Sequence, residues 1–155
     1  PEINVKIHKN KLEKHNILEI LSNYDVIIDG SDNFETRFIV NDACLELGKP
    51  LISGAILRFE GQIACFRPYL TPKSPCYRCF YPDVPPEGTM PNCSTNGIIA
   101  PIAGIIGSMQ ALYAIKLITG NDDGLDGFVT IYDGKANQFR KVKLQKDENC
   151  VCGSR

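Results

Sequence analysis

The feature that most constrains the fold is an alternation of short β-branched runs with helical segments in the first third of the chain. Residues 26–28 form an apolar run closed by Asp29-Gly30, which predicts a buried parallel strand between two apolar layers. Residues 12–21 before it and residues 34–47 after it have apolar side chains at helical spacing. A further strand is predicted from residue 50 to residue 53. Such an order predicts an α/β fold with right-handed crossovers.

The pattern changes after residue 54. Residues 55–66 are predicted as a long strand interrupted at Gly61, and residues 128–133 and 138–144 as a hairpin. A helix is predicted over residues 98–117 with Gly120 beyond its end, and a short strand over residues 4–8. Parallel strands therefore continue into antiparallel hairpins. A length of 155 residues with 43% hydrophobic residues suits a single domain over residues 1–155.

Composition narrows the classes of partner and the location. The 17 basic and 18 acidic side chains give a net charge of -1 without a basic stripe, so we expect no nucleic-acid partner. The apolar stretch from residue 97 to residue 120 is interrupted by Pro101, Gln110 and Lys116, which favours a buried helix over a membrane span. No secretion signal is recognisable at Pro1. We therefore expect a cytoplasmic protein without a membrane partner.

The cysteines form two local pairs. Cys76 and Cys79 make a C-x-x-C knuckle in a proline-rich stretch, and Cys150 and Cys152 make a C-x-C pair near the end of the sequence. Seven cysteines cannot all pair as disulfides, and four thiolates in two pairs suit a closed tetrahedral Zn²⁺ site. A redox-active C-x-x-C and unrelated free thiols are the alternatives. The sequence favours structural zinc.

The other three cysteines have different predicted environments. Cys93 lies in a loop shortly before a predicted helix, where a thiol with a lowered pKa could act as a nucleophile, although a lone loop cysteine is commonly inert. Cys44 and Cys65 fall on core-facing positions of a predicted helix and strand. We interpret these two as small buried hydrophobic residues.

Polar residues follow the strand predicted at residues 26–28, at the edge where open α/β sheets bind ligands. Asp32 and Asn33 offer a carboxylate and an amide to a metal-bound phosphate, and the adjacent helix N-terminus favours anions. Asp32 could instead cap that helix, with Glu35 completing a capping box. The local sequence leaves both interpretations open, and they are compatible.

Several motifs together resemble one known family, the MoeB/ThiF/HesA adenylyltransferases, which are relatives of ubiquitin-activating enzymes. The similarity runs in order along nearly the whole chain. The matching motifs are YDVIIDGSDNFETR (24–37), GKPLISG (48–54), EGQ (60–62), CYRC (76–79), IIGSMQAL (105–112) and YDG (132–134) followed by Phe139-Arg140. The resemblance implies the second half of a Rossmann-like sheet with a four-cysteine zinc site.

The resemblance also implies an activity. Members use ATP and Mg²⁺ to adenylate the C-terminal glycine of a ubiquitin-like sulfur-carrier protein that ends in Gly-Gly, for sulfur transfer in molybdopterin, thiamin or related biosynthesis. Asp32 matches the family's metal-coordinating aspartate and Asn33 its nucleotide-contacting neighbour, whereas Arg37 is expected only to pair with nearby carboxylates. Members are homodimers, and a match for Cys93 forms a covalent link during thiolation in some of them. Residues 80–96 correspond to the crossover loop along which the carrier's tail lies.

The sequence departs from the family in two respects. Its second cysteine pair is C-x-C where C-x-x-C is usual, which puts the placement of Cys150 or Cys152 in doubt. No glycine-rich phosphate turn precedes residue 24, so we expect the N-terminal nucleotide-binding half to be absent and this chain to be inactive alone. The rival function is a non-catalytic, zinc-stabilised docking and dimerisation module for a ubiquitin-like protein. A dehydrogenase half is disfavoured because no dinucleotide fingerprint is present.

Overall fold

A five-stranded mixed sheet forms the centre of the computed structural model, which describes residues 2–83 and 97–153. Its strands, in spatial as well as chain order, are β1 (Ile27–Asp29), β2 (Leu51–Leu57), β3 (Glu60–Phe66), β4 (Phe128–Asp133) and β5 (Gln138–Lys143). β1 and β2 pair in parallel through a helical crossover, and the three following pairings are antiparallel. The predicted passage from parallel strands into antiparallel hairpins is confirmed.

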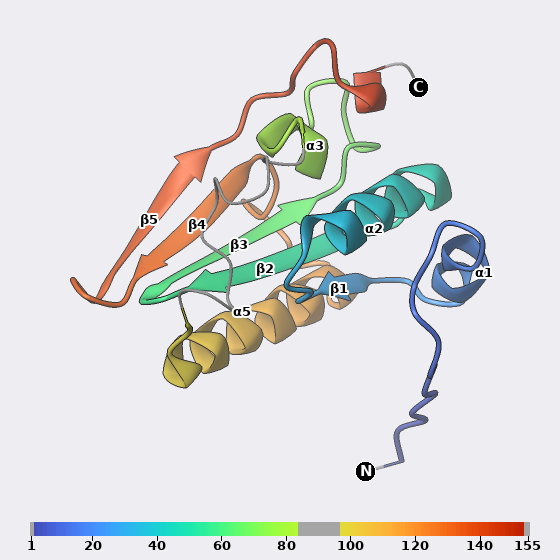
Figure 1. Ribbon diagram of the computed structural model, residues 1–155. Helices are drawn as coiled ribbons and strands as arrows, with labels where there is room; N and C mark the ends of the chain where they lie inside the picture. The colour runs from blue at the N-terminus through green and yellow to red at the C-terminus, as the bar shows by residue number, and fades with distance from the viewer. Residues whose placement is uncertain (1, 84–96, 154–155) are drawn as a thin grey trace.

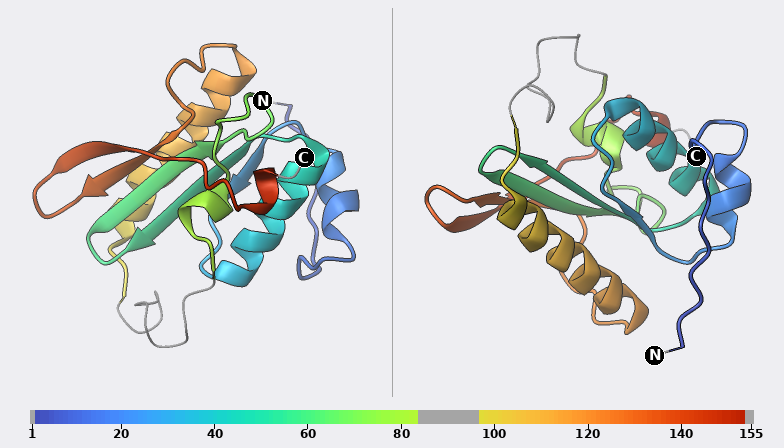
Figure 2. Two further views of the ribbon diagram at one scale, coloured as in Figure 1. Left: turned by 90° about the horizontal axis from the view of Figure 1, so that it is seen from above. Right: turned by 60° about the horizontal axis from the view of Figure 1, so that its bottom comes forward.

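Helices cover the two faces of the sheet unequally (Figures 1 and 2). On one face lie α2 (Phe34–Leu47) and the short α3 (Tyr77–Phe80), with α1 (Ile17–Ser22) packed beside α2 near the β1 edge. Of the helices in the described residues, the long α5 (Ala100–Ile118) covers the opposite face. A 3₁₀ turn, η1 (Val151–Gly153), lies near the end of the chain, close to α3.

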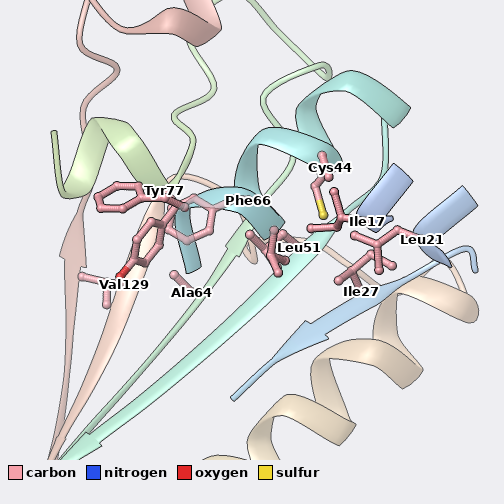
Figure 3. Packing of buried hydrophobic residues seen from close by; sticks show 12 residues of the cluster. Ile17, Leu21, Ile27, Cys44, Leu51, Ala64, Phe66, Tyr77 and Val129 are labelled. Atoms are coloured by element: carbon pink, nitrogen blue, oxygen red, sulfur yellow. The ribbon is translucent and has the colours of Figure 1, made fainter. Parts of the chain in front are cut away.

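The main core lies between the sheet and the helices α1, α2 and α3 (Figure 3). Its buried side chains include Leu51, Phe66 and Val129 from three strands. The Tyr77 ring from α3 packs edge-on against Phe66, with ring centroids 5.8 Å apart. The start of the cysteine knuckle is thus part of the core, so the loop around it is anchored by burial as well as by its cysteines.

On the opposite face, α5 approaches the sheet closely because glycines lie beneath it. Its buried stripe consists of Ile102, Ile106 and Gln110, spaced four residues apart. A Cβ added at Gly61 would lie 2.4 Å from the Ile106 side chain, and one added at Gly54 would lie 2.6 Å from Gln110. The predicted break at Gly61 is therefore wrong, because this glycine lies inside β3 and makes room for α5.

β2 and β3 form a hairpin. Its turn consists of Arg58 and Phe59, since Leu57 pairs with Glu60. Arg58 adopts a φ of 53°, which suits the two-residue hairpin turns that match strand twist. The β4–β5 hairpin and the 34–47 helix are confirmed, and Gly48 ends that helix in the left-handed conformation at φ 63°.

Two predictions near the N-terminus differ from the structure. Residues 4–8 form no strand, and Ile3, Val5 and Ile7 are each more than 70% exposed. A strand requires a neighbour to bond its backbone, and none of the described strands pairs with this segment. The helix predicted from residue 12 begins only at Ile17, because Asn16 bonds the backbone of Lys11 and Glu13 and holds the preceding residues in a turn.

Among the residues described, α5 is the one helix long and apolar enough to cross a membrane by length and composition, with a mean hydropathy of 1.4. One of its faces covers β2 and β3. Its outer face exposes Leu112, Ile115 and Ile118, the last at 73%. A helix with one face on a sheet and an apolar outer face is typical of an interface between protein chains.

Candidate functional site

Asp32 lies in the loop that joins the carboxyl end of β1 to α2. β1 ends at Asp29 and α2 begins at Phe34, so four residues make the connection. The Asp32 side chain is exposed, and its Oδ1 accepts a 3.4 Å hydrogen bond from Asn33 Nδ2. The carboxylate is therefore presented to solvent at the sheet edge where α/β proteins bind ligands.

Asn33, not Asp32, caps α2. Its side-chain oxygen accepts a 2.8 Å hydrogen bond from the Thr36 backbone, and its backbone is extended. The capping alternative considered for Asp32 is therefore wrong by one residue. Because Asn33 already satisfies this helix-end donor, the Asp32 carboxylate remains available for another ligand.

Arg37 holds the loop from the α2 side of the sheet. Its side chain is 7% exposed and lies 3.7 Å from the Asp29 carboxylate. It donates to Ser53 Oγ at 3.0 Å and to the Gly54 carbonyl at 2.7 Å, and it also donates to the Ser31 carbonyl. Arg37 thus joins the end of β1 to the middle of β2, which agrees with its expected role as a partner for a nearby carboxylate.

The loop also contains a buried hydroxyl without a partner. Ser31 donates its backbone N–H to Asp29 Oδ1 at 2.8 Å, but its Oγ has no hydrogen-bond partner among the described residues. The same is true of Asp29 Oδ2, whose charge is balanced by the ion pair with Arg37. A buried hydroxyl left unpaired is unfavourable, so its place next to Asp32 is compatible with a bound polar group at this edge.

The cysteine knuckle is attached to α2 by the two residues between its cysteines. The Tyr77 backbone donates to Asn41 Oδ1 at 2.9 Å. Arg78 forms a two-pronged ion pair with Asp42, with both N–O distances 2.7 Å, and lies over the Phe38 ring. These bonds fix Cys76 and Cys79 relative to the core.

The second cysteine pair reaches the first through tight turns at the end of the chain. Cys150 N–H donates to the Asp147 carbonyl at 3.1 Å, and Gly153 N–H donates to the Cys150 carbonyl at 2.7 Å. Lys146 Nζ donates to the Cys152 carbonyl at 3.2 Å. These turns bring both sulfurs to the knuckle, so the C-x-C spacing does not misplace either cysteine.

The four sulfurs are arranged as ligands of one metal ion. The distances are 3.6 Å for Cys76–Cys150, 3.5 Å for Cys79–Cys152 and 4.0 Å for Cys76–Cys79, and all four sulfurs lie within 4.8 Å of one another. A tetrahedral site with Zn–S bonds of about 2.3 Å places sulfurs about 3.8 Å apart. The donor set and its size fit Zn²⁺, and the spacing is too long for disulfides.

The electrostatics of this cluster also favour a cation. A hydrogen bond with Cys76 lowers the pKa of the Cys79 thiol to about 4 despite its burial. The same hydrogen bond raises the pKa of Cys76, and burial raises the pKa of Cys152 to about 12. One thiolate is therefore easily formed, whereas several thiolates at this spacing require a positive charge among them.

The remaining cysteines divide into two cases. Cys44 and Cys65 are buried, as expected, and burial raises the pKa of each thiol to about 12. Both are therefore unreactive at neutral pH. Cys93 and residues 84–96 of the expected crossover loop lie outside the described residues.

The sequence analysis missed Gln110, whose amide reaches the last residue of β1 and the second residue of β2 from the α5 side. The available signal was its position four residues after Ile106, in register with an apolar stripe. A polar side chain at such a position is buried, and a buried amide requires partners. The sequence cannot name those partners because they lie on other elements.

Comparisons with known proteins identify the family of this chain. Residues 1–153 match the ThiF family. The chain is 46% identical to the adenylyltransferase and sulfurtransferase MOCS3 of Dictyostelium discoideum over an alignment of 156 positions, which covers 99% of this chain and 36% of that protein. It is 42% identical to the sulfur carrier protein adenylyltransferase of Thermus thermophilus, over 99% of this chain and 58% of that protein. It is 39% identical to the SAMP-activating enzyme E1 of Haloferax volcanii, over 99% of this chain and 56% of that protein.

Solved structures share the fold. MccB of E. coli superposes with a TM-score of 0.74 at 16% identity, over 96% of this chain and 44% of that one. A structure of MccB with ATP gives a TM-score of 0.72 at 14% identity, over 96% of this chain and 45% of the MccB chain. The chain thus spans between 36% and 58% of the lengths of these relatives and structures. The matched family, the sheet topology and the four converging cysteines lead to one conclusion: the chain belongs to the ThiF family.

Proposed function

We propose that this chain is part of an ATP-dependent adenylyltransferase that activates the C-terminal glycine of a ubiquitin-like sulfur-carrier protein. The observation that carries the proposal is the exposed Asp32 carboxylate at the carboxyl edge of β1, in a loop fixed by Arg37 and by the α2 cap. The similarity to sulfur-carrier adenylyltransferases over 99% of the chain supports it.

The reaction requires charge neutralisation and alignment. A glycine carboxylate oxygen of the carrier bonds to the α-phosphorus of ATP, the α–β phosphoanhydride bond breaks, and pyrophosphate leaves with the bond's electron pair. Mg²⁺ would supply the positive charge that offsets the phosphates. Asp32 would hold this ion, since Mg²⁺ commonly binds one or two carboxylates together with substrate phosphates and water.

Asn33 and Ser31 would contribute to the same edge. The Asn33 side-chain oxygen is used by the helix cap, so its Nδ2, which donates to Asp32 Oδ1, would be the group that contacts a nucleotide. The unpartnered Ser31 hydroxyl would gain a hydrogen bond from a polar ligand at this place. The start of α2 adds a partial positive charge that favours phosphate.

Zn²⁺ would be structural in this protein. Four cysteine ligands leave no open position for a substrate, which is typical of a structural rather than a catalytic zinc site. Bound at Cys76, Cys79, Cys150 and Cys152, the ion would tie the knuckle, which is hydrogen-bonded to α2, to residues 150–152.

Cys93 would be the nucleophile that links covalently to the carrier during thiolation. Its thiolate would attack the acyl carbon of the carrier adenylate and form a thiol-cleavable thioester, while AMP leaves with the electron pair of the broken acyl–oxygen bond. A Cys93→Ala variant of the product of the complete open reading frame should retain adenylation but lose a thiol-cleavable adduct with the carrier, as seen by non-reducing electrophoresis. Retention of the adduct would assign the link to another cysteine.

A homodimer would form through the outer face of α5. The exposed Leu112, Ile115 and Ile118 would be covered in such a dimer. In light scattering, an Ile115→Asp variant should have the molar mass of a monomer, whereas the unmodified protein should have that of a dimer. The reason is that a buried unpaired charge opposes association. An unmodified protein that remains monomeric across a concentration series would exclude the dimer.

The activity is tested by ATP–pyrophosphate exchange. The product of the complete open reading frame is assayed beside the 155-residue chain, each with a ubiquitin-like carrier ending in Gly-Gly and with a truncated carrier lacking that pair. We expect Mg²⁺-dependent exchange in the longer protein with the intact carrier and none in the 155-residue chain alone. Carrier binding without exchange by the longer protein would instead support a zinc-stabilised docking module.

A further inference from the structure

Gln110 is a polar residue at the end of the buried stripe through which α5 contacts the sheet. It continues the stripe of Ile102 and Ile106, and it is 8% exposed. The sheet accommodates it because β2 has Gly54 opposite, where an added Cβ would meet the Gln110 amide at 2.6–2.9 Å. The Gln110 amide therefore occupies space against β2 that the side chain of any residue other than glycine at position 54 would fill.

The amide bonds two neighbouring strands at the edge that leads to Asp32. Gln110 Nε2 donates to the Asp29 carbonyl at 2.8 Å and to the Ile52 carbonyl at 3.3 Å. Asp29 is the last residue of β1 and pairs with Ser53, the residue after Ile52. The end of β1 is thus tied to β2 from the α5 face.

From the opposite face, Arg37 of α2 contacts the same two segments. It pairs with the Asp29 carboxylate and donates to the carbonyls of Ser31 and Gly54. Gln110 and Arg37 therefore hold the backbone on both sides of the sheet, at positions shortly before Asp32. The segment between β1 and α2 has little freedom left, because Asn33 is fixed by the helix cap.

We propose that Gln110 is a positioning residue for Asp32, with Gly54 as the residue that admits it. It touches no reacting atom, and acts by fixing where β1 ends and hence where the Asp32 carboxylate meets a phosphate-bound metal. The kinetic part of this inference rests on the proposed adenylation. Placement of a charged group by rigid neighbours is what such a reaction needs, since small misplacements reduce rates strongly.

The first test measures the loop directly in the product of the complete open reading frame. Gln110→Met keeps the side-chain length and removes the donor. The matched control, Tyr113→Phe, removes one hydrogen bond from the same helix to Thr130 of the sheet. Hydrogen exchange of residues 29–33 should be about tenfold faster in Gln110→Met than in the control, as expected for the loss of one buried hydrogen bond.

The second test uses kinetics that a purely structural role would not alter. In Gln110→Met the Mg²⁺ concentration for half-maximal exchange should rise several-fold and kcat should fall, while KM for the carrier stays unchanged. Gly54→Ala should reproduce this pattern without altering Gln110 itself, because its Cβ displaces the amide. It also provides a second measurement if Gln110→Met folds poorly.

Each outcome decides the inference. Equal hydrogen exchange in Gln110→Met and Tyr113→Phe overturns it, as does faster exchange with an unchanged Mg²⁺ dependence, which would make Gln110 a structural tie only. An unmodified protein that shows no pyrophosphate exchange refutes the proposed adenylation instead. In that case hydrogen exchange still decides whether Gln110 holds the Asp32 loop.

Discussion

The cysteine cluster and the Asp32 loop are two polar centres with opposite designs. The cluster collects four ligands from two segments that are far apart in sequence, and all four are present among the described residues. The Asp32 loop is local in sequence, and supporting residues on β2, α2 and α5 hold a single exposed carboxylate in place. One centre brings together four groups that could hold a metal ion, and the other exposes one carboxylate above a buried hydrogen-bonded support.

This difference indicates how the two centres use their surroundings. Burial at the cluster raises the pKa of Cys152 and disfavours its thiolate, so a bound metal and the tertiary structure would stabilise each other. At the Asp32 loop, the supporting residues Asp29, Arg37 and Gln110 are buried, and the Asp32 carboxylate remains in solvent. Loss of the metal should therefore affect stability, whereas loss of Asp32 should affect activity alone.

The largest effect on stability is expected from metal removal. A strong chelator should remove about one zinc per chain and lower the melting temperature by roughly 10 °C or more, because a structural site contributes several kcal/mol and each kcal/mol is worth about 2–4 °C at this size. Calorimetry with elemental analysis measures both. Cys79→Ser should lose the metal, whereas Cys44→Ala should keep it. Freshly purified, unchelated protein without zinc would refute the site.

The largest effect on activity is expected from Asp32→Asn in the product of the complete open reading frame. Pyrophosphate exchange should fall on the order of a hundredfold or more, because a group that stabilises charge in the transition state is lost. The melting temperature should not change, since the side chain is exposed. Asp25→Asn is the matched control, because Asp25 is also exposed and precedes the opposite end of β1. Equal activity in the two variants would remove Asp32 from the mechanism.

An intermediate effect is expected beneath the loop. Arg37→Met should destabilise the fold by about 3–5 kcal/mol, because it leaves the buried Asp29 carboxylate unpaired. Asp29→Asn combined with Arg37→Met should recover part of this loss, as measured by urea unfolding of the four members of the cycle. Strict additivity of the two substitutions would show that the pair is not coupled.

The smallest effect is expected at a part-buried ion-pair cluster that joins the end of β3 to the segment between α5 and β4. Arg67 pairs with Asp122 and Asp126, and its hydrogen bond lowers the pKa of Asp122. A lowered folded-state pKa gives stability that is present above the ordinary carboxyl pKa of about 4 and is lost as the pH falls. The difference in melting temperature between the unmodified protein and Arg67→Met should therefore shrink below about pH 4. A constant difference down to about pH 2 would contradict this assignment.

Much of the architecture could be predicted because it depends on local patterns. The α2 helix and its Gly48 end, and the hairpin that begins at Phe128, are encoded by apolar periodicity and turn residues. The four cysteines of the cluster could also be identified, because two closely spaced pairs of cysteines are typical of a metal site. The C-x-C spacing suggested a defect that the turns of the last segment remove.

Other features required the tertiary structure. Gly61 was assigned to a break because glycine commonly weakens strands, but contact with Ile106 explains it. The cap of α2 fell to Asn33 and not to Asp32, a difference of one residue that local sequence does not resolve. Gln110 could not be given partners from its own helix.

The sequence by itself determined the types of most elements, the four cysteines of the cluster and the position of Asp32 after the carboxyl end of β1. Periodicity, capping and side-chain chemistry act over a few residues, so they can be recognised in a linear chain. Only the tertiary structure decided that Gln110 and Arg37 meet the end of β1 from opposite faces, and that four sulfurs lie at metal-ligand distances. These contacts join residues distant in sequence, and their geometry depends on how closely the helices pack on the sheet.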